Sequence, residues 1–498
     1  MEDAPQDLPS PLSPEPPHVR TQRWTLVVVC TATAMLMLDI AVVNTALSRI
    51  ADDLHTGLGG LQWVVDAYTL SLATVVLSAG SLADRLGRRR LFTIGLSLFT
   101  ASSMACALAQ DITFLNVARA VQGIGAAVMF AVSLALLAHA FPNPKERAGA
   151  FAAYGAAIGA SFAVGPLVGG LLTSGLGWQW IFLVNVPIGL VCLAITRAYV
   201  EESRDPRSHG IDWPGQATLA AGLFLLVLAL LRGNDQGWTS TPIVLELSGA
   251  LATMIAFVAI ELRVAEPMLP LRFFRNRAFT GAQAAAFAIS ASFFAIFLYT
   301  TLYLQGVLGL SAIEAGLAYL PGTMVMLFVS GATSSLGAKV PARVMVSLGL
   351  AMVAVGMVLF TLAGTGSSWT IILPGELIAL IGTGLFNPAL TSVALGSVPP
   401  EQSGVAAGVN DTFRQAGIAV GVAALGALIP AGGVFGGADP GAYVGGLHDA
   451  LLVGAVLAAV GAVAAAILIP RSFVTAPPIA DAEPEPRVAL GGLVPEAA

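Results

Sequence analysis

Charged residues are scarce in this chain. Of its 498 residues, 10% are Asp, Glu, Lys or Arg, whereas 56% are hydrophobic, and the mean hydropathy is +0.83. A water-soluble domain carries roughly a quarter of charged residues to cover its surface. The composition therefore excludes a soluble enzyme and a disordered protein, and it predicts a membrane protein.

Groups that could perform chemistry are equally few. The five histidines are scattered, and Cys30, Cys106 and Cys192 each lie in an apolar run without a Cys-x-x-Cys spacing. Such cysteines are typical of small buried hydrophobic residues rather than of metal or redox ligands. No G-x-x-x-x-G-K-[ST] phosphate loop occurs, which excludes a self-contained ATP-driven pump. We expect no metal, no cofactor, no nucleic-acid partner and no enzyme activity.

Long apolar stretches dominate the rest of the sequence. Fourteen of them are long enough to cross about 30 Å of hydrocarbon at about 1.5 Å per residue. They predict an all-α integral membrane protein with helices grouped as six, two and six. The N-terminal six-helix bundle spans 24–199, two inserted helices span 216–262, and the C-terminal six-helix bundle spans 279–470. Residues 1–23 and 471–498 are expected to be disordered cytoplasmic tails.

The basic residues indicate the orientation. An even number of spans places both termini on one side of the membrane. If that side is cytoplasmic, nineteen of the 23 basic residues lie inside and only Arg49 and Arg232 lie outside. Arg119 and Arg414 fall within spans. This positive-inside pattern predicts cytoplasmic termini, and the acidic, proline-rich start lacks the basic region of a signal peptide.

An internal repeat relates the two bundles. LADRLGRR at 82–89 returns as LGAKVPAR at 336–343, and GIG at 123–125 returns as GTG at 382–384. Similar composition in helices rich in Gly and Ala is an alternative explanation for each match. Two like-oriented bundles of six helices are typical of transporters, which enclose a site at the interface of their repeats.

Several motifs then carry a resemblance to a known family. GSLADRLGRRR at 80–90 resembles the signature of the major facilitator superfamily. LDIAVVNTAL at 38–47, RAVQGIGAA at 119–127 and GPLVGG at 165–170 resemble, in this order, motifs of its fourteen-helix drug:proton antiporter branch, the EmrB/QacA type of multidrug and antibiotic exporters. The chain departs from those motifs at Ala41, Ser48 and Ser161.

This resemblance implies a proton-coupled antiporter that exports drugs, antibiotics or other amphipathic small molecules by alternating access. A symporter that imports a small nutrient is the alternative, and both the motif in span five and the fourteen helices disfavour it. The resemblance also implies a multi-pass protein of a bacterial inner membrane. Two lysines against 21 arginines are consistent with a GC-rich bacterium. We expect a monomer, and a substrate that can be cationic.

Asp39 is the expected proton carrier. It lies about 22 Å from one end of span one and about 15 Å from the other, where a charge costs roughly 2.5–3.5 kcal/mol. Low dielectric favours the neutral form of a carboxylic acid. Arg119 cannot lose its proton, so its approach would favour ionised Asp39 and its retreat the protonated acid. A permanent ion pair that only neutralises two buried charges is the alternative.

Other intramembrane polar residues are candidates for the substrate pathway. Asp66, towards the outer mouth, could attract a cationic substrate or could be a water-exposed acid at a helix end. Asp411 could line the pathway or could neutralise Arg414, three residues later on the same helix. Glu376 and Glu246 are expected at the interface. The pathway candidates are Asn44, Asp66, Gln122, Asp411, Arg414 and Gln415.

Two glycine-containing motifs are candidates for conformational control. The first, the cytoplasmic gate motif, is expected to form ion pairs with neighbouring helix ends and to lock the cytoplasmic face, while its glycines allow close packing and a tight turn. The second, the antiporter motif, is expected to bend span five and let a neighbouring helix approach. The cytoplasmic gate motif comprises Gly80, Asp84, Arg85, Gly87, Arg88 and Arg89, and the antiporter motif comprises Gly155, Gly159, Gly165, Pro166, Gly169 and Gly170.

Overall fold

The computed structural model describes residues 17–204, 212–336, 339–399, 402–430 and 439–471. Every regular element in these ranges is a helix, and they contain no strand. The all-α fold is therefore confirmed. Most of the two expected tails, 1–16 and 472–498, lies outside the described residues.

The N-terminal bundle contains six spans, the last of which is divided in two. Short helices and turns connect them, so consecutive spans run antiparallel. The elements are α1 (Pro17–Asp53), α2 (Leu58–Leu86), α3 (Arg88–Ala107), α4 (Ile112–Ala140), α5 (Pro144–Gly175), α6 (Trp180–Leu183) and α7 (Asn185–Tyr199).

The inserted pair and the C-terminal bundle follow. Span nine is interrupted by two π-helical segments, a feature common at functional sites. The elements are α8 (Trp213–Gln236), α9 (Thr241–Glu261), η1 (Leu271–Arg275), α10 (Arg277–Ile289), η2 (Ser290–Phe294), α11 (Ala295–Leu302), η3 (Tyr303–Val307), α12 (Ala312–Leu336), α13 (Ala342–Phe360), η4 (Trp369–Ile372), α14 (Leu373–Gly396), α15 (Ser403–Gly426) and α16 (Pro440–Leu468).

Thirteen helical segments of the described residues are long and apolar enough to cross a membrane. The remaining expected span corresponds to α15, which has 24 residues and packs against α2, α10 and η2. Its lower hydropathy follows from Asn410, Asp411, Arg414 and Gln415, which interrupt the apolar run. The polar residues of α15 therefore lie inside the bundle rather than in a loop.

The start of α1 corrects the expected boundary of the N-terminal tail. Residues 17–23 are helical and extend span one beyond the membrane-sized segment that begins at Trp24. Tyr199 at the end of α7 holds this extension: its ring stacks on Trp24 at 5.4 Å, and its hydroxyl accepts a hydrogen bond of 2.7 Å from Arg20. Stacking against a distant aromatic residue is a tertiary effect that composition does not reveal.

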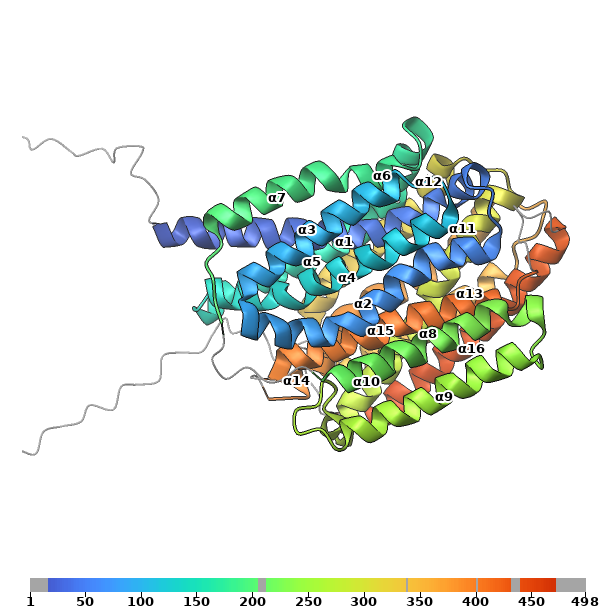
Figure 1. Cartoon of the computed structure of the whole chain (residues 1–498). Helices are drawn as coiled ribbons and strands as arrows, with labels where there is room; N and C mark the ends of the chain where they lie inside the picture. The colour runs from blue at the N-terminus through green and yellow to red at the C-terminus, as the bar shows by residue number, and fades with distance from the viewer. Residues whose placement is uncertain (1–16, 205–211, 337–338, 400–401, 431–438, 472–498) are drawn as a thin grey trace, which may run out of the picture.

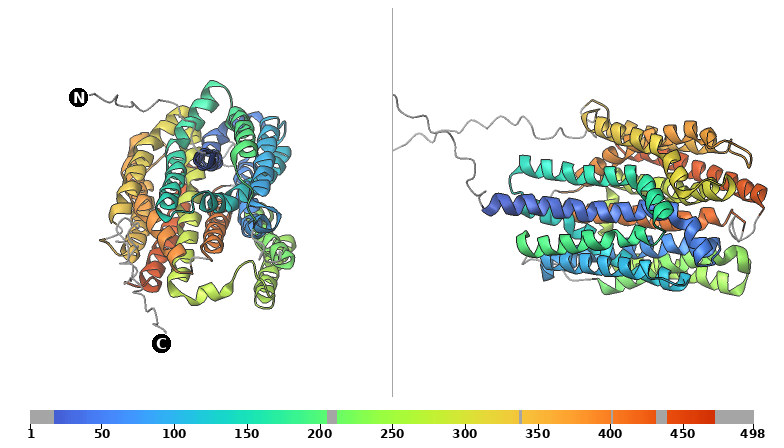
Figure 2. Two further views of the ribbon diagram at one scale, coloured as in Figure 1. Left: turned by 90° about the vertical axis from the view of Figure 1, so that its left-hand side faces the viewer. Right: turned by 90° about the horizontal axis from the view of Figure 1, so that it is seen from above.

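Figure 1 shows the spans as one elongated bundle, with α1 entering from the same side as the α2–α3 turn. In the end view of Figure 2, the N-terminal helices and the yellow and orange C-terminal helices lie side by side, and the pair α8 and α9 lies at the periphery. This pair contacts the bundles through α8, which packs on α2 and α15. We call the end with the start of α1 and Gly87 the inner end, and the opposite end the outer end.

Direct contacts between the bundles close the outer end. Gln305 of η3 donates a hydrogen bond of 3.0 Å to the carbonyl oxygen of Thr45 and accepts one from Ser48, both in α1. Gln62 of α2 donates a hydrogen bond of 2.7 Å to the hydroxyl of Tyr299 in α11. These polar contacts join α1 to η3 and α2 to α11, so the two bundles touch each other at the outer end.

The antiporter motif forms close helix contacts, both within the N-terminal bundle and with α12. A Cβ added at Gly170 would stand 2.7 Å from the Cα of Ile313 in α12, and one at Gly169 would stand 2.8 Å from the carbonyl oxygen of Val42 in α1. At Gly165 an added Cβ would overlap Ala41. The expected close approach is therefore present at the second half of the motif, where α5 packs on α1 and on α12.

The first half of the motif behaves differently. A Cβ at Gly155 would meet nothing within 4 Å, and one at Gly159 would be 3.6 Å from a flexible methyl group of Leu327. Gly80 of the gate motif likewise has no atom within 4 Å of an added Cβ. All three glycines border a cavity, which corrects the expectation that they permit close helix packing.

This difference generates a prediction about Gly169. Replacing Gly169 with Ala should force α1 and α5 apart, because the added methyl group overlaps the backbone of α1, and overpacking costs about 1–3 kcal/mol. We expect a lower unfolding temperature of the purified protein in detergent. Gly155→Ala, on the same helix but with free space, is the matched control. Equal unfolding temperatures for the two variants would contradict the packing described here.

Candidate functional site

Asp39 and Arg119 form an ion pair inside the N-terminal bundle. The Oδ2 atom of Asp39 in α1 lies 2.5 Å from Nη1 of Arg119 in α4, and the two side chains are 0% and 2% exposed. The residues are eighty positions apart in the chain. The structure thus brings together the two residues that the sequence analysis assigned to proton coupling, and in this conformation they are paired.

Gln122 completes a closed network around the pair. Its side-chain oxygen accepts a hydrogen bond of 2.7 Å from Arg119, and its nitrogen donates to Oδ1 of Asp39 at 2.9 Å and to the hydroxyl of Ser103 at 2.8 Å. Asn185 adds a second donor to Oδ1 of Asp39, at 3.1 Å. Both oxygens of the carboxylate are therefore hydrogen-bonded, as a buried charge requires.

Three further groups hold the guanidinium of Arg119. Its Nε donates a hydrogen bond of 3.0 Å to the carbonyl oxygen of Val64 in α2. The guanidinium carbon lies 4.3 Å from the ring centre of Tyr68 and 5.6 Å from that of Phe182. Cation–π contact with two aromatic faces stabilises a buried cation. Five helical segments thus converge on one pair of charges: α1, α2, α4, α6 and α7.

Sequence reasoning found part of this network. Asp39, Arg119 and Gln122 were expected to be functional, but Ser103 and Asn185 were not. Asn185 is part of the segment WQWIFLVNVP at 178–187. It follows Val184, where α6 ends and α7 begins. An amide beside a helix break within an apolar span was the available signal, whereas a serine of α3 had none.

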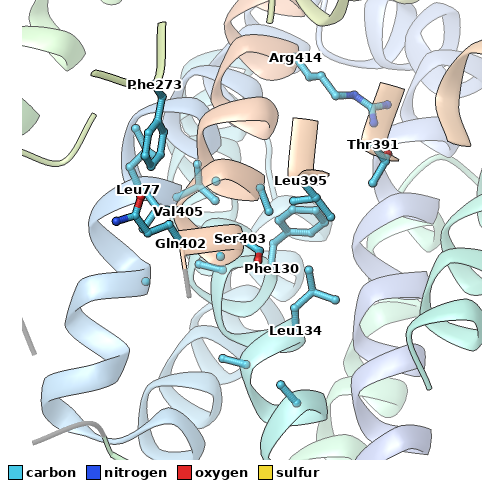
Figure 3. A pocket seen from close by; sticks show the side chains of 18 of the residues that line it. Leu77, Phe130, Leu134, Phe273, Thr391, Leu395, Gln402, Ser403, Val405 and Arg414 are labelled. Atoms are coloured by element: carbon cyan, nitrogen blue, oxygen red, sulfur yellow. The ribbon is translucent and has the colours of Figure 1, made fainter. Parts of the chain in front are cut away.

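A large cavity of about 2030 Å³ opens at the inner end between the bundles. Charged residues surround its mouth, including Asp84, Arg88 and Arg272, whereas its deeper wall is mostly apolar and aromatic. Figure 3 shows Phe130, Leu395 and Arg414 lining it from α4, α14 and α15. Other deep lining residues are Tyr154, Phe162, Phe294, Met326 and Leu327. A cavity of this kind suits an amphipathic molecule.

Arg414 supplies the charge at the middle of this cavity. Its guanidinium carbon lies 5.9 Å from the ring centre of Phe294, and no carboxylate of the described residues lies within ion-pair distance. Asp411 is 7% exposed and its Oδ2 atom has no hydrogen-bond partner among the described residues. Neither Asp411 nor Gln415 lines the cavity in this conformation. The ion pair considered between Asp411 and Arg414 is therefore not formed.

Asp66 lies in a different place from the one expected. It is 0% exposed, and neither carboxylate oxygen has a partner among the described residues, so it is not a water-exposed acid at a helix end. One helical turn before it, Gln62 bonds to Tyr299 of the other bundle. The closed outer interface therefore covers Asp66. Asn44 donates to the carbonyl oxygen of Ile40 within α1, at 3.2 Å, and joins neither site.

The gate motif makes its contacts within the N-terminal half. Arg88 pairs with Asp84 at 2.9 Å, and Gly87 turns the chain between α2 and α3 with a φ of 107°. The carboxylate of Glu202 accepts hydrogen bonds from the backbone N–H groups of Arg89 and Arg90, at 3.0 and 3.1 Å. Glu202, which the motif did not reveal, therefore caps the start of α3. Arg85 is exposed.

Known proteins agree with this architecture. Residues 29–422 match the family described as Major Facilitator Superfamily. This chain belongs to the major facilitator superfamily. Its members are membrane transporters rather than enzymes, so this major facilitator moves small molecules across a bilayer. The family resemblance predicted from the motifs is confirmed.

Relatives of this major facilitator carry names from drug resistance. It is 37% identical over 412 residues to "Multidrug resistance protein Stp" of Mycobacterium tuberculosis. The aligned region covers 83% of this chain and 76% of that one. It is 32% identical to "Methylenomycin A resistance protein" of Streptomyces coelicolor, over 80% of this chain and 84% of that one. "Puromycin resistance protein pur8" of Streptomyces alboniger is 34% identical, with 81% and 80% covered.

Solved structures show the same fold at low identity. The human organic anion transporter MFSD10 (TETRAN) aligns with a TM-score of 0.61 and 15% identity, covering 91% of this chain and all of that one. A transporter of the POT family, solved with a thioalcohol-conjugated peptide, aligns with a TM-score of 0.64 and 14% identity, covering 88% and 94%. Both likenesses concern the major facilitator fold alone.

The network around Asp39 generates a stability prediction. Gln122→Leu should remove the hydrogen bonds to Asp39, Arg119 and Ser103, at about 0.5–1.5 kcal/mol for each lost bond. We expect a clearly lower free energy of unfolding, measured by denaturant titration in detergent. Asn116→Leu, one turn before Arg119 on α4, is the control, because the Asn116 side-chain oxygen has no partner among the described residues. A loss no larger than that of the control would contradict the network.

Proposed function

We propose that this major facilitator is a proton-coupled antiporter that exports drugs, antibiotics or other amphipathic small molecules by alternating access. The observation that carries the proposal is the buried Asp39–Arg119 pair between α1 and α4, in a protein whose cavity opens at the inner end. The names of the relatives in mycobacteria and streptomycetes support export of antibiotics.

The pair offers a way to link proton binding to conformation. In the closed network, Arg119 lies against the carboxyl group of Asp39, and Gln122 and Asn185 donate hydrogen bonds to it. Protonation of Asp39 would remove the Coulomb attraction and leave Arg119 without its counter-charge, which favours a different arrangement of α1 and α4. Two residues further along α1, Ala41 packs on Gly165 of the antiporter motif. A shift of α1 would therefore act directly on α5 and the outer interface.

The proton gradient supplies enough free energy for this cycle. One proton crossing a potential of 100 mV releases about 2.3 kcal/mol, which supports a gradient of roughly fifty-fold in a neutral substrate. No cofactor is required by this scheme.

The cavity favours particular substrates. Its mid-depth charge is the guanidinium of Arg414, surrounded by aromatic residues such as Phe294 and Phe162. A cationic substrate was considered because of Asp66, but Asp66 is buried in the closed outer interface and does not line this cavity. In this conformation we infer that neutral or anionic amphiphiles fit better than cations.

The proposed setting is the plasma membrane of a bacterium, with the inner end and both termini in the cytoplasm and the protein acting as a monomer. The basic residues Arg88, Arg147, Arg272 and Arg275 at the mouth of the cavity support this orientation. The cavity would then accept substrate from the cytoplasm or the inner leaflet.

The proposal predicts that Asp39→Asn abolishes proton-driven export. Asparagine keeps hydrogen-bonding capacity and nearly the same volume, but it cannot bind and release a proton. We expect at least a tenfold loss of pH-gradient-driven uptake into inverted vesicles, normalised to the amount of inserted, folded protein, with fluorescent amphiphiles of both charges as probes.

Asp52→Asn provides the control, because Asp52 is an exposed acid on the same helix. Undiminished proton-driven uptake by Asp39→Asn would refute the coupling role. Uptake in the same direction as proton movement, rather than in exchange for protons that move the opposite way, would favour the nutrient symporter.

A further inference from the structure

Glu376 is a buried acid that the transport scheme does not use. It lies in the first turn of α14, where the sequence predicted an interfacial position, yet it is only 1% exposed. Neither of its carboxylate oxygens has a hydrogen-bond partner among the described residues. The end of the span is covered here by neighbouring helices, which is why nearness to the end did not produce exposure.

The surroundings of Glu376 come mainly from α12. Its Oε1 atom lies 2.5 Å from the position that a Cβ at Gly322 would take, so a residue larger than glycine would collide with the carboxyl group. Tyr319 is the titratable group that faces it from α12. The hydroxyl of Tyr319 is already bonded to Thr300 at 2.9 Å. Tyr319 thus donates no hydrogen bond to the carboxyl group, which faces the backbone of Gly322 instead.

The other elements around the start of α14 bring no charge. From α13, the chain beside Gly375 consists of Gly356, Leu359 and Phe360, and η4 contains no ionisable residue. The charged residues of α15 face elsewhere. Arg414 lines the cavity, and Asp411 lies near Tyr68 and Tyr154 of the N-terminal bundle, with which it interacts electrostatically. No basic side chain among the described residues lies within ion-pair distance of Glu376.

A carboxylate in such a place would be an unpaired buried charge, which costs several kcal/mol even after relaxation. The group avoids this cost by keeping its proton. We propose that Glu376 is a second proton-binding site of this transporter, located in the C-terminal bundle and occupied by a proton while the outer end is closed.

The internal repeat gives this site a counterpart. Aligning Leu82 with Leu336 places Tyr68 opposite Gly322, and aligning Gly123 with Gly382 places Arg119 two residues from the position of Glu376. In one bundle Arg119 of α4 lies against Tyr68 of α2; in the other Glu376 of α14 lies against Gly322 of α12. The same helix pair therefore holds an ionisable group in each half.

Glu376 packs against α12, the helix whose contacts with α5 help to close the outer end. On its other side α12 contacts α5: Thr323 donates a hydrogen bond of 2.8 Å to the carbonyl oxygen of Ala163, and a Cβ at Gly316 would stand 3.2 Å from the Cα of Leu167. Ionisation of Glu376 would place a charge beside Gly322 and draw water between α12 and α14. Neutral Glu376 thus stabilises the closed outer end, and its deprotonation favours opening.

Infrared spectroscopy of the full-length protein in detergent tests the protonation of Glu376. A protonated carboxylic acid has its own C=O stretching band. At about pH 7, where an exposed glutamate is ionised, Glu376→Gln should remove the intensity of one such group relative to the parent protein. Glu314→Gln is the control, because Glu314 is an exposed acid on α12 and its change should leave the band unaltered. Unchanged intensity in Glu376→Gln overturns the proposal.

A distance measurement tests the link to the outer end. Spin labels on Leu176→Cys and Leu317→Cys, two exposed positions directly after α5 and on α12, report their separation in a background without the three native cysteines. As the pH rises, we expect a longer-distance population in the parent and at least a threefold smaller one in Glu376→Gln. Equal populations overturn the conformational role.

The role of Glu376 in transport rests on the proposed proton-coupled export. Neither measurement requires transport, however, so their failure would leave the export assay of Asp39→Asn untouched. Conversely, export without proton movement would overturn the proposed function while the infrared band of Glu376 persisted.

Discussion

The ion pair between Asp39 and Arg119 is the interaction on which the rest of the N-terminal bundle depends. Two full charges with almost no exposure would each cost several kcal/mol if unpaired. Gln122, Asn185 and the rings of Tyr68 and Phe182 surround them with donors, acceptors and aromatic faces. Because these groups come from several helices, the positions of those helices are constrained by one electrostatic requirement.

Close backbone contacts connect this requirement to the interface between the bundles. Gly165 and Gly169 of α5 pack on α1 just beyond Asp39, while Gly170 packs on the start of α12. Contacts without intervening side chains leave little freedom for one helix to move independently of the next. Gly155 and Gly159 have no such contacts and instead border the cavity.

Much of this arrangement could be predicted from the sequence, and the failures have a common cause. Hydropathy indicated the spans, the motifs indicated the family, and depth along a helix singled out Asp39 and Arg119. Depth did not reveal that Asp66 and Glu376 are covered by neighbouring helices, that Asn185 donates to Asp39, or that Ser103 accepts from Gln122. Those facts depend on which face of each helix meets which neighbour, and Gly- and Ala-rich helices carry little periodic signal to decide it.

The sequence by itself determined that the chain spans a membrane many times and which positions within those spans are polar, because hydrocarbon tolerates only apolar helices of a certain length. The tertiary structure alone decided which of these polar groups are paired. Asp39 meets a distant arginine and two further donors, Gln122 and Asn185, whereas the carboxylates of Asp66 and Glu376 have no hydrogen-bond partner among the described residues. The reason is that helical rise sets the depth of a side chain locally, while its partners are supplied by helices far away in the chain.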